Sequence, residues 1–448
     1  MRTWLMLAPL MALAVWHAPG QADAGLKQAV KADYDAYLSP LFLHFHKNPE
    51  LSYVETQTAA RMAAELRKTG AEVTTGVGGT GVVGIMRNGP GPTILLRADM
   101  DGLPVKEDSG LPYASTAMQK GHDGVLYPVM HACGHDTHIT ALVGAARRLA
   151  AMKDRWNGTI LFVVQPAEER IGGARKMMQD GLYTRFPKPD YALAFHVDAD
   201  TPTGKMVVTP GLLFSSADTV DIIVHGVGAH GASPHRGKDP VVMGSEIVMA
   251  LQTLVSRELS PLSPGVVTVG AFNAGNKHNI ISDKAHLQLT VRSNERAVRD
   301  QLIAGIQRIA ANVGRMNGMP EDKLPTVTVS DEQAPPTVND AGLAARIGAA
   351  FRREFGESAL LPYVQTDMGA EDFPAFVEPG SGVKGLYFMV GGTPQAAFDA
   401  ARAGGPPVPS HHSPFFKVDP EPSITLGTEA MVLATLDLLG PGQKVAAQ

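Results

Sequence analysis

The chain of 448 residues contains a single cysteine, Cys133, so no intrachain disulfide can form. It lacks any long run of lysine and arginine and carries a net charge of −5, whereas a nucleic-acid-binding protein needs a concentrated positive surface. After residue 24, no apolar stretch is long enough to cross a bilayer. These absences predict a globular protein with no nucleic acid partner and no membrane association in its mature form. The length predicts two or three domains.

The N-terminal segment has the features of an export signal. Arg2 precedes an apolar stretch at residues 4–16, and Ala22-Asp23-Ala24 has the small residues of a cleavage site. We therefore expect a signal peptide over residues 1–24 and a mature chain that is periplasmic or secreted. An apolar first helix of the folded domain is the alternative.

Short apolar runs alternate with helical patterns through much of the chain. Gly70 ends a helical pattern at 31–69, and further helical patterns occupy 137–152 and 173–180. Such alternation predicts a doubly wound α/β domain with a mainly parallel sheet. The runs expected to form its buried parallel strands are 81–86, 93–98, 159–165, 191–196 and 386–391.

A different order of elements lies in the middle of the chain. Its strands and helices follow one another as β-α-β-β-α-β, the order of a ferredoxin-like α+β unit. We expect residues 214–330 to form an inserted lid or dimerisation domain, and residues 25–213 with 331–448 to form a discontinuous catalytic domain. The elements expected in the insertion are 217–224, 239–257, 265–272, 280–293, 295–317 and 325–330.

Polar clusters follow the predicted parallel strands, and the carboxyl ends of such strands meet at one edge of a sheet. Asp99 and Asp101 come directly after one strand, where they could orient a ligand or a histidine. The segment 130–138 holds Cys133 and His135 ahead of a predicted helix. A thiolate and an imidazole two residues apart suit a soft divalent cation.

Three further strand ends or loops supply candidate ligands. Glu168 and Glu169 follow one strand, so one carboxylate could bind metal while the other accepts a proton. His196 ends another strand, and His412 belongs to a late histidine pair. Five candidate ligands suffice for two cations: Cys133, His135, Glu169, His196 and His412.

The inserted domain has polar residues of its own. His230 lies between glycines on a predicted turn, from which it could reach out of its domain. Asn279 precedes a predicted strand, and Arg292 lies near that strand's end. An arginine there can pair with a substrate carboxylate through two hydrogen bonds.

These motifs together resemble the two-metal hydrolase superfamily of carboxypeptidase G and the aminoacylases, in the branch of hippurate hydrolase and the plant auxin-conjugate hydrolases. The resemblance runs from about residue 30 to residue 435. The motifs that carry it are Arg97-Ala98-Asp99-Met100-Asp101, His131-Ala132-Cys133-Gly134-His135-Asp136, Pro166-Ala167-Glu168-Glu169, Gly228-Ala229-His230, Gly369-Ala370-Glu371-Asp372-Phe373 and His412-Ser413-Pro414.

The resemblance implies a metal-dependent hydrolase that removes an aryl-acyl or other apolar acyl group from N-acyl amino acids and releases a carboxylic acid and a free amino acid. It implies that the five candidate ligands hold two divalent metal ions per chain, with zinc or manganese ahead of nickel or cobalt. Glu168 would be the general base and Asp101 an orienting residue. His230 would reach the active site of a second subunit of a homodimer or higher oligomer and stabilise the oxyanion. Asn279 and Arg292 would hold the substrate carboxylate.

Two other interpretations remain open at this stage. Cys133 could be a nucleophile with His135 or His131 as its base. The chain could instead be an exported, non-catalytic binding protein that depends on metal. Chelation and alkylation distinguish the first alternative from a metal enzyme, and replacement of Glu168 tests the second.

Overall fold

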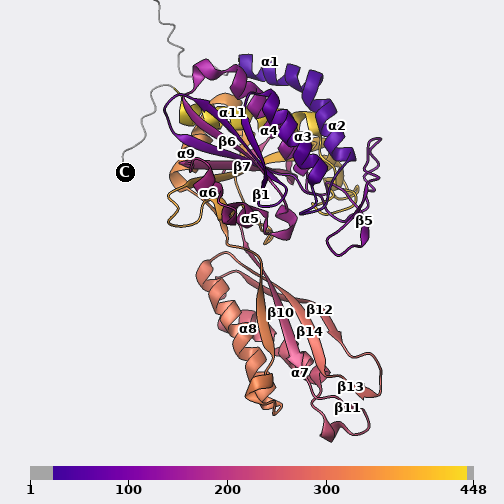
Figure 1. The fold of residues 1–448 in the computed structure, drawn as a ribbon. Coiled ribbons are helices and arrows are strands. Elements are labelled where there is room, and N and C mark those ends of the chain that lie inside the picture. Colours follow the sequence, from indigo (N-terminus) through magenta and orange to yellow (C-terminus); the bar gives the residue numbers. More distant parts are fainter. Residues whose placement is uncertain (1–23, 441–448) are drawn as a thin grey trace, which may run out of the picture.

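The computed structural model of the protein describes residues 24–440. The predicted signal peptide lies outside these residues except for Ala24, where the first helix begins. The described chain forms a large domain and a small domain that are joined by two extended strands (Figure 1). The predicted α/β fold with an inserted α+β unit is confirmed.

The large domain is built on an eight-stranded sheet. The pairings β6–β3, β3–β7, β7–β18 and β8–β17 are parallel. The sequence predicted that strand 81–86 would also be parallel, which is wrong, because β2 pairs antiparallel with β1 and with β6. In spatial order the strands are β1 (Glu72–Val77), β2 (Gly81–Asn88), β6 (Gly158–Gln165), β3 (Thr93–Asp99), β7 (Tyr191–Pro202), β18 (Lys384–Thr393), β8 (Met206–Val207) and β17 (Leu360–Leu361).

Helices cover both faces of this sheet, which explains why its central strands read as continuous apolar runs. Ile94 and Leu96 of β3 point into one core, and Leu95 between them points into the other. The first core is closed by α1 (Ala24–Asp33), α2 (Ser39–Lys47), α3 (Thr56–Lys68), α4 (His135–Ala151), α9 (Ala341–Phe355) and α11 (Pro420–Leu439). The second is closed by α5 (Gly173–Gln179), α6 (Leu182–Arg185) and the short helix η8 (Phe373–Phe376).

The helix expected over residues 31–69 is interrupted. A π-helical turn, η1 (Tyr34–Leu38), lies between α1 and α2, and residues 48–55 separate α2 from α3. Asn48 has φ −130° and ψ 51°, because the proline at position 49 disfavours a helical conformation in the residue before it. This break brings the segment before α3 to the edge of the sheet where the polar clusters lie.

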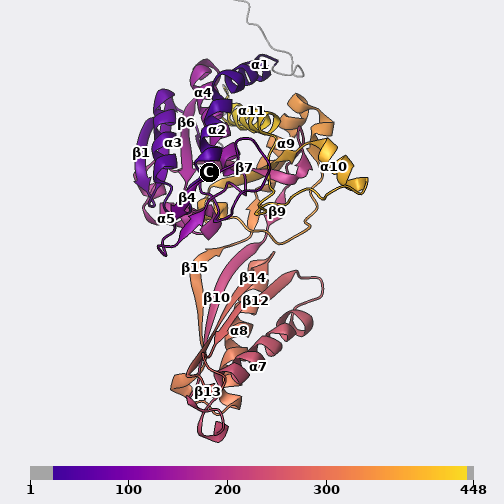
Figure 2. The same ribbon diagram turned by 90° about the vertical axis from the view of Figure 1, so that its right-hand side faces the viewer.

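The small domain is a four-stranded antiparallel sheet with two helices on one face (Figure 2). Alternate residues of its strands, such as Val220, Ile222 and Leu287, form its separate core with the helices. Its sheet order is β12 (Gly265–Ala274), β14 (Lys284–Ser293), β10 (Ser216–His225) and β15 (Thr326–Ala334); its helices are α7 (Pro240–Thr253) and α8 (Arg296–Met316). A two-stranded ribbon of β11 (Ala229–His230) and β13 (Ile280–Ile281) lies at its far end.

The chain leaves and re-enters the large domain at one place. β9 (Gly211–Phe214) pairs with β16 (Thr337–Asn339) just before β10 begins and just after β15 ends. The return therefore follows Ala334, at Pro335-Pro336, whereas the predicted boundary was residue 330.

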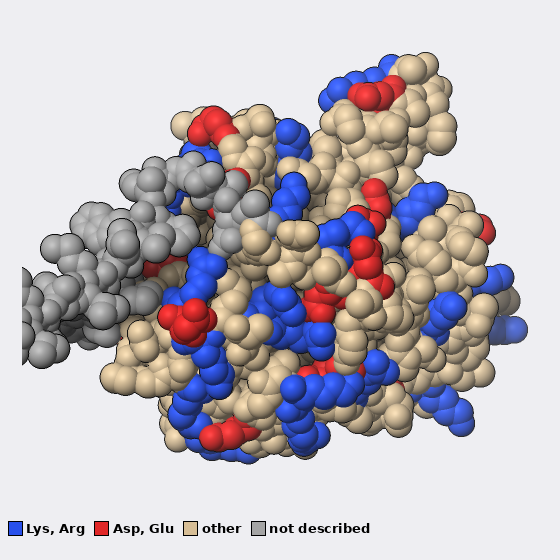
Figure 3. Space-filling model, turned by 90° about the horizontal axis from the view of Figure 1, so that it is seen from above, with Lys and Arg blue, Asp and Glu red and all other residues tan. Residues whose placement is uncertain are grey.

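Smaller elements complete the described chain. They are the hairpin β4 (Met118–Lys120) with β5 (Leu126–Pro128) and the helix α10 (Gln395–Arg402). Seen from above the large domain, lysine and arginine side chains are interspersed with aspartate and glutamate (Figure 3). Among the helices of residues 24–440, none has both the length and the apolar character needed to cross a membrane.

Candidate metal centre

The strand order brings the predicted site residues to one edge of the sheet. β6, β3, β7 and β18 are neighbours, and the loops after them converge at their carboxyl ends. Gly134, which precedes α4, has φ +85°, and a Cβ there would lie 2.3 Å from Cγ1 of Val197. A glycine is therefore required where Cys133 and His135 turn toward the other loops.

The five candidate ligands lie together in two overlapping groups. Ligand atoms of Cys133, His135 and His196 lie within 4.8 Å of one another, and so do those of Cys133, Glu169 and His412. The thiol of Cys133, common to both groups, is 3.5 Å from Nε2 of His196. Oxygens of Glu169 lie 3.8 Å from Nε2 of His135 and 3.4 Å from Nε2 of His412. One sulfur, three imidazoles and one carboxylate therefore surround a common space.

The hydrogen bonding of these donors fits metal ions. Both ring nitrogens of His135 and Oε1 of Glu169 are buried without a hydrogen-bond partner, which is costly for polar atoms. His196 contacts the backbone oxygen of Val197 through Nδ1 at 2.6 Å, which leaves Nε2 directed at the thiol. His138 is different, because both of its ring nitrogens are engaged, at 2.6 Å by Asp99 and at 2.8 Å by a backbone amide.

The charges at the site also favour cations. Burial, with the charges of Glu371 and Glu169, raises the pKa of Glu168 well above its usual range. Burial raises the pKa of Glu169 to about 8, with Asp101 adding to the increase against the opposing effect of His135. Several buried carboxylates so close together repel one another, and bound divalent cations would relieve that repulsion.

Asp101 orients the loop that carries the two glutamates. Its oxygens accept hydrogen bonds from the backbone N–H groups of Glu168 at 3.0 Å and Glu169 at 3.1 Å. Oδ1 of Asp101 also lies 3.4 Å from Nδ1 of His135. One buried carboxylate thus positions both glutamates and contacts a candidate ligand, as hydrogen-bonded carboxylates commonly do around metal sites.

Sequence reasoning missed a second carboxylate that holds the same loop. Oε1 of Glu55, which is fully buried, accepts a hydrogen bond of 2.8 Å from the backbone N–H of Ala167. Ala167 has φ +48° and ψ +44°, a left-handed conformation that is costly for any residue except glycine. The amides of residues 167–169 are therefore all held by Glu55 and Asp101. No local pattern marks Glu55, because its partner amide lies 112 residues away.

A buried ion network lies beneath the glutamates. The fully buried guanidinium of Arg97 donates to Asp99 at 2.6 Å, to Glu371 at 2.6 Å and to Oε1 of Gln165 at 2.8 Å. Oxygens of Glu371, Asp372 and Glu168 lie within 4.8 Å of one another. Arg97 therefore supplies the buried positive charge that balances part of the acidic cluster.

The structure does not bring all of the predicted site residues to the candidate metal centre. Arg292 lines a cavity of about 400 Å³ together with Cys133, Glu168 and His196. His230, in β11, and Asn279, just before β13, are exposed at the far end of the small domain (Figure 1). Within one described chain they lie outside this cavity.

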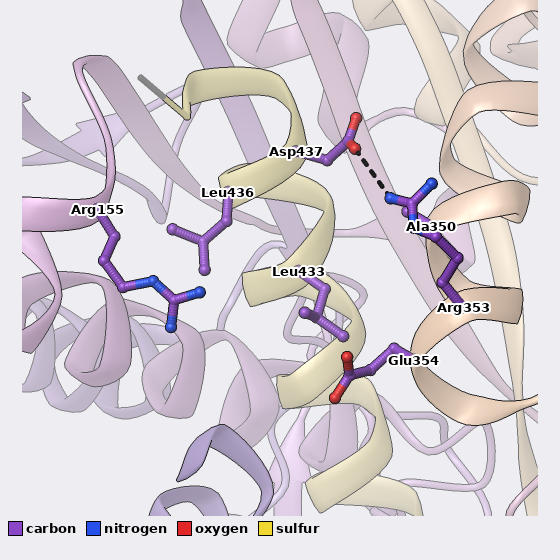
Figure 4. Close-up of a pocket in the computed structure, with 7 residues that line it drawn as sticks. All are labelled: Arg155, Ala350, Arg353, Glu354, Leu433, Leu436 and Asp437. Atoms are coloured by element: carbon purple, nitrogen blue, oxygen red, sulfur yellow. Dashed lines mark ion pairs between the residues drawn. The ribbon is translucent and has the colours of Figure 1, made fainter. Parts of the chain in front are cut away.

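A further hollow lies between α9 and α11 on another part of the large domain (Figure 4). In it Arg353 and Asp437 form an ion pair of 3.7 Å, and no histidine or cysteine is among the residues that line it. This hollow therefore lacks the imidazole and thiol donors of the candidate metal centre.

Comparison with known proteins agrees with this geometry. The model of peptidase family M20/M25/M40 matches residues 95–403. The chain belongs to this family. Its predicted membership is confirmed, and so is its assignment as a metal-dependent amidohydrolase.

Several known proteins are similar to this chain over most of its length. Hippurate hydrolase of Campylobacter jejuni is 37% identical over 334 residues, which is 74% of this chain and 83% of that protein. The crystal structure of a putative aminohydrolase from methicillin-resistant Staphylococcus aureus has 30% identity and a TM-score of 0.79, covering 92% of this chain and 99% of that one. YxeP of Bacillus subtilis, described as a dinuclear metal-binding peptidase, shares the fold with 24% identity and a TM-score of 0.71, covering 92% and 99%.

Proposed function

We propose that the protein hydrolyses the amide bond of N-acyl amino acids and releases a carboxylic acid and a free amino acid. One observation carries this proposal: the five candidate metal ligands surround a space that also contains the carboxylate of Glu168, which is not one of the five. The name of the hippurate hydrolase relative supports the substrate class.

Two divalent cations per chain fit the two donor groups that share Cys133. Zinc or manganese suits the mixture of sulfur, nitrogen and oxygen donors, and nickel or cobalt is compatible with it. When bound, such ions would activate a water molecule and polarise the substrate carbonyl. Elemental analysis of the purified protein tests both the number and the identity of the ions.

In the proposed reaction Glu168 is the proton carrier. Its carboxylate takes a proton from the attacking water and then gives that proton to the nitrogen of the leaving amino acid. Asp101 and Glu55 fix the backbone on either side of Glu168. Arg292, at the wall of the same cavity, pairs with the substrate carboxylate and so places the amide at the metal centre.

His230 and Asn279 are proposed to act in a second copy of the chain. Both are exposed and lie together, since the backbone N–H of Gly231 donates to the carbonyl of Asn279 at 2.8 Å. In a homodimer or larger homo-oligomer, His230 would stabilise the oxyanion and Asn279 would contact the substrate in the partner's cavity.

Export is proposed from the N-terminal sequence. Arg2, the apolar stretch at 4–16 and the small residues Ala22-Asp23-Ala24 support removal of a signal peptide and a periplasmic or secreted mature protein. N-terminal sequencing of the protein from its native cells tests this; an intact Met1 in the mature protein would contradict it.

Replacement of Glu168 tests the activity. Glu168→Gln keeps the size and one oxygen of the side chain but removes the base, so kcat on N-benzoyl and N-acetyl amino acids should fall about 10²- to 10⁴-fold with metal content unchanged. Glu378→Gln, at an exposed position, is the matched control and should keep wild-type kcat.

The same assays separate the alternatives. A wild-type protein that turns over no acyl amino acid, and whose ligand binding survives Glu168→Gln, would be a binding protein. An activity that persists in a strong chelator and is lost on alkylation of Cys133 would indicate a thiol hydrolase. Burial, with the charges of Glu169 and Glu168, raises the pKa of the Cys133 thiol well above its usual range, which disfavours a free thiolate nucleophile.

A further inference from the structure

His411 lies beside the candidate metal centre but is not one of the five candidate ligands. Its Nδ1 is 3.8 Å from the sulfur of Cys133, a distance at which an N–H group can donate to a sulfur atom. The backbone N–H of His412 donates to the carbonyl of Ala132 at 2.8 Å, which ties the histidine pair to the loop that carries Cys133. With φ +65° at His412, the two rings reach different partners: His412 lies 3.4 Å from Glu169, and His411 lies at the sulfur.

The hydrogen bonding of the His411 ring decides which of its nitrogens carries the proton. The backbone N–H of Ala199 donates to Nε2 at 3.0 Å, so Nε2 must present a lone pair. A neutral imidazole has one donor and one acceptor nitrogen, and therefore the proton of His411 is on Nδ1. Oδ1 of Asp198 lies 3.8 Å from Nε2, too far to form a competing hydrogen bond. His411 therefore directs an N–H group at Cys133.

His196 contacts the same sulfur with the opposite arrangement. Its Nδ1 donates to the backbone oxygen of Val197 at 2.6 Å, so its Nε2, 3.5 Å from the sulfur, presents a lone pair. A cation can use that lone pair, whereas the N–H of His411 cannot bind a cation. The two rings lie 5.1 Å apart at their centroids and are nearly perpendicular, at 81°. Two histidines thus contact Cys133 in different ways, one with a ligand atom and one with a hydrogen-bond donor.

Packing holds the donating ring in place. The rings of His411 and Phe416 lie 4.8 Å apart at their centroids with an interplanar angle of 35°, and Phe416 is buried. Together with the hydrogen bond from Ala199, this contact fixes the ring on two sides. Since the ring is already ordered, its hydrogen bond to the sulfur costs little conformational entropy. The arrangement matches the outer groups that orient and tune metal ligands.

We propose that His411 is a positioning residue that donates a hydrogen bond from Nδ1 to the thiolate of Cys133. This inference rests on the proposed metal centre, because it is metal binding that makes the sulfur of Cys133 a thiolate. The donor offsets part of the buried negative charge of the sulfur and fixes its direction. Because the sulfur belongs to both donor groups, one N–H group affects the whole centre. A sulfur that donates less electron density leaves the metal centre more electrophilic.

Two replacements separate the two hydrogen bonds of the ring. In His411→Asn the amide nitrogen can occupy the place of Nδ1 and donate to Cys133, but the side chain is too short to reach Ala199. In His411→Gln the amide oxygen can occupy the place of Nε2 and accept from Ala199, which leaves no donor at the sulfur. His44→Asn, at an exposed position of α2, is the control. Each protein is loaded with cobalt, which is compatible with the donors, and its unfolding temperature is measured.

The thiolate-to-cobalt charge-transfer absorption reports directly on the sulfur. A hydrogen bond lowers the energy of the sulfur lone pairs, so its loss should move this band to longer wavelength in His411→Gln, while His411→Asn and His44→Asn stay near the wild type. The affinity for cobalt, from competition with a chelator, and kcat should each fall about tenfold in His411→Gln. His411→Asn should retain most of both.

The outcomes distinguish this inference from the function on which it rests. A His411→Asn protein with the band of His411→Gln, or a His411→Gln protein with the band of the wild type, would overturn the role of His411 and leave the amidohydrolase intact. Loss of a bound cobalt ion in both variants would make His411 a ligand, which also contradicts the inference. A wild-type protein that binds no divalent cation would refute the proposed metal centre itself.

Discussion

Removal of the Glu55 carboxylate should impair catalysis although Glu55 does not line the metal cavity. Its Oε1 accepts hydrogen bonds of 2.8 Å from the backbone N–H groups of Tyr53 and Ala167, and its Oε2 accepts one of 2.5 Å from the Thr80 hydroxyl. Glu55→Ala leaves the buried amide of Ala167 without an acceptor. The next residue in the chain is Glu168, so any relaxation of Ala167 moves the proposed base.

The size of the expected loss of kcat follows from two opposing free-energy contributions. Leaving a buried backbone donor without an acceptor costs roughly 1–3 kcal/mol, and the left-handed conformation of Ala167 costs roughly 1–2 kcal/mol. The hydrogen bond from Ala167 to Glu55 therefore stabilises the loop by about as much as the left-handed conformation destabilises it. Without Glu55, the backbone at Ala167 can relax. Since misplacement of a catalytic group by about 1 Å can cost about 10²-fold, we expect kcat to fall roughly 30- to 100-fold in Glu55→Ala, with a small change in KM.

The decisive assay combines this change with Ala167→Gly. Glycine adopts the left-handed conformation without the Cβ penalty. In the Glu55→Ala background, Ala167→Gly should therefore raise kcat roughly five- to tenfold. On its own, Ala167→Gly should change kcat little. Glu55→Gln keeps an acceptor oxygen for both amides and should stay near the wild type. Metal content and unfolding temperature are measured for each variant. If Ala167→Gly changes kcat by the same factor in both backgrounds, Glu55 does not act through Ala167 and the reasoning is refuted.

Two other predictions follow from the geometry. Mixing His230→Ala and Glu168→Gln subunits, each inactive alone, should restore about a quarter of wild-type activity, because half of the dimers are mixed and each has one complete site; no recovery would place His230 outside the partner's site. Burial alone would lower the pKa of His46, but its hydrogen bonds to Asp136 (2.7 Å) and Glu107 (3.2 Å) raise it to about 9. The resulting stabilisation is complete below pH about 6.5 and is lost as pH rises through about 9, so His46→Gln should lower the free energy of unfolding by roughly 3 kcal/mol at pH 6 and much less at pH 10. An equal loss at both pH values in denaturant titrations would contradict this.

Much of the fold was predictable because its signals are local. Buried parallel strands such as β3 and β6 read as continuous apolar runs, and the element order of the small domain is visible in its periodicity. The direction of β2 was not predictable, because an apolar run has the same composition whether its neighbours are parallel or antiparallel. The break at residues 48–55 had a local signal in Pro49, which the helical pattern around it obscured.

The candidate site was predictable to the extent that its residues are chemically unusual. Cys133 two residues before His135 is hard to explain by packing alone. Paired glutamates after a strand indicate a catalytic site at the edge of the sheet where that strand ends. Glu55 and the contacts of Arg97 with Glu371 could not be predicted from the residues themselves, because a buried carboxylate and a solvated one look the same in a sequence. Their roles depend on partners brought together only by the fold.

Because β9 pairs with β16, the small domain could be removed without interrupting the sheet of the large domain. Phe214 and Thr337 face each other as antiparallel partners, so the two ends left by excision of residues 215–336 already have the geometry of a β-hairpin. A two-residue Asn-Gly connection suits such a closure, and the eight-stranded sheet loses no strand by it. The same junction would accept a foreign insert, provided that the new cap replaces Arg292 at the wall of the metal cavity.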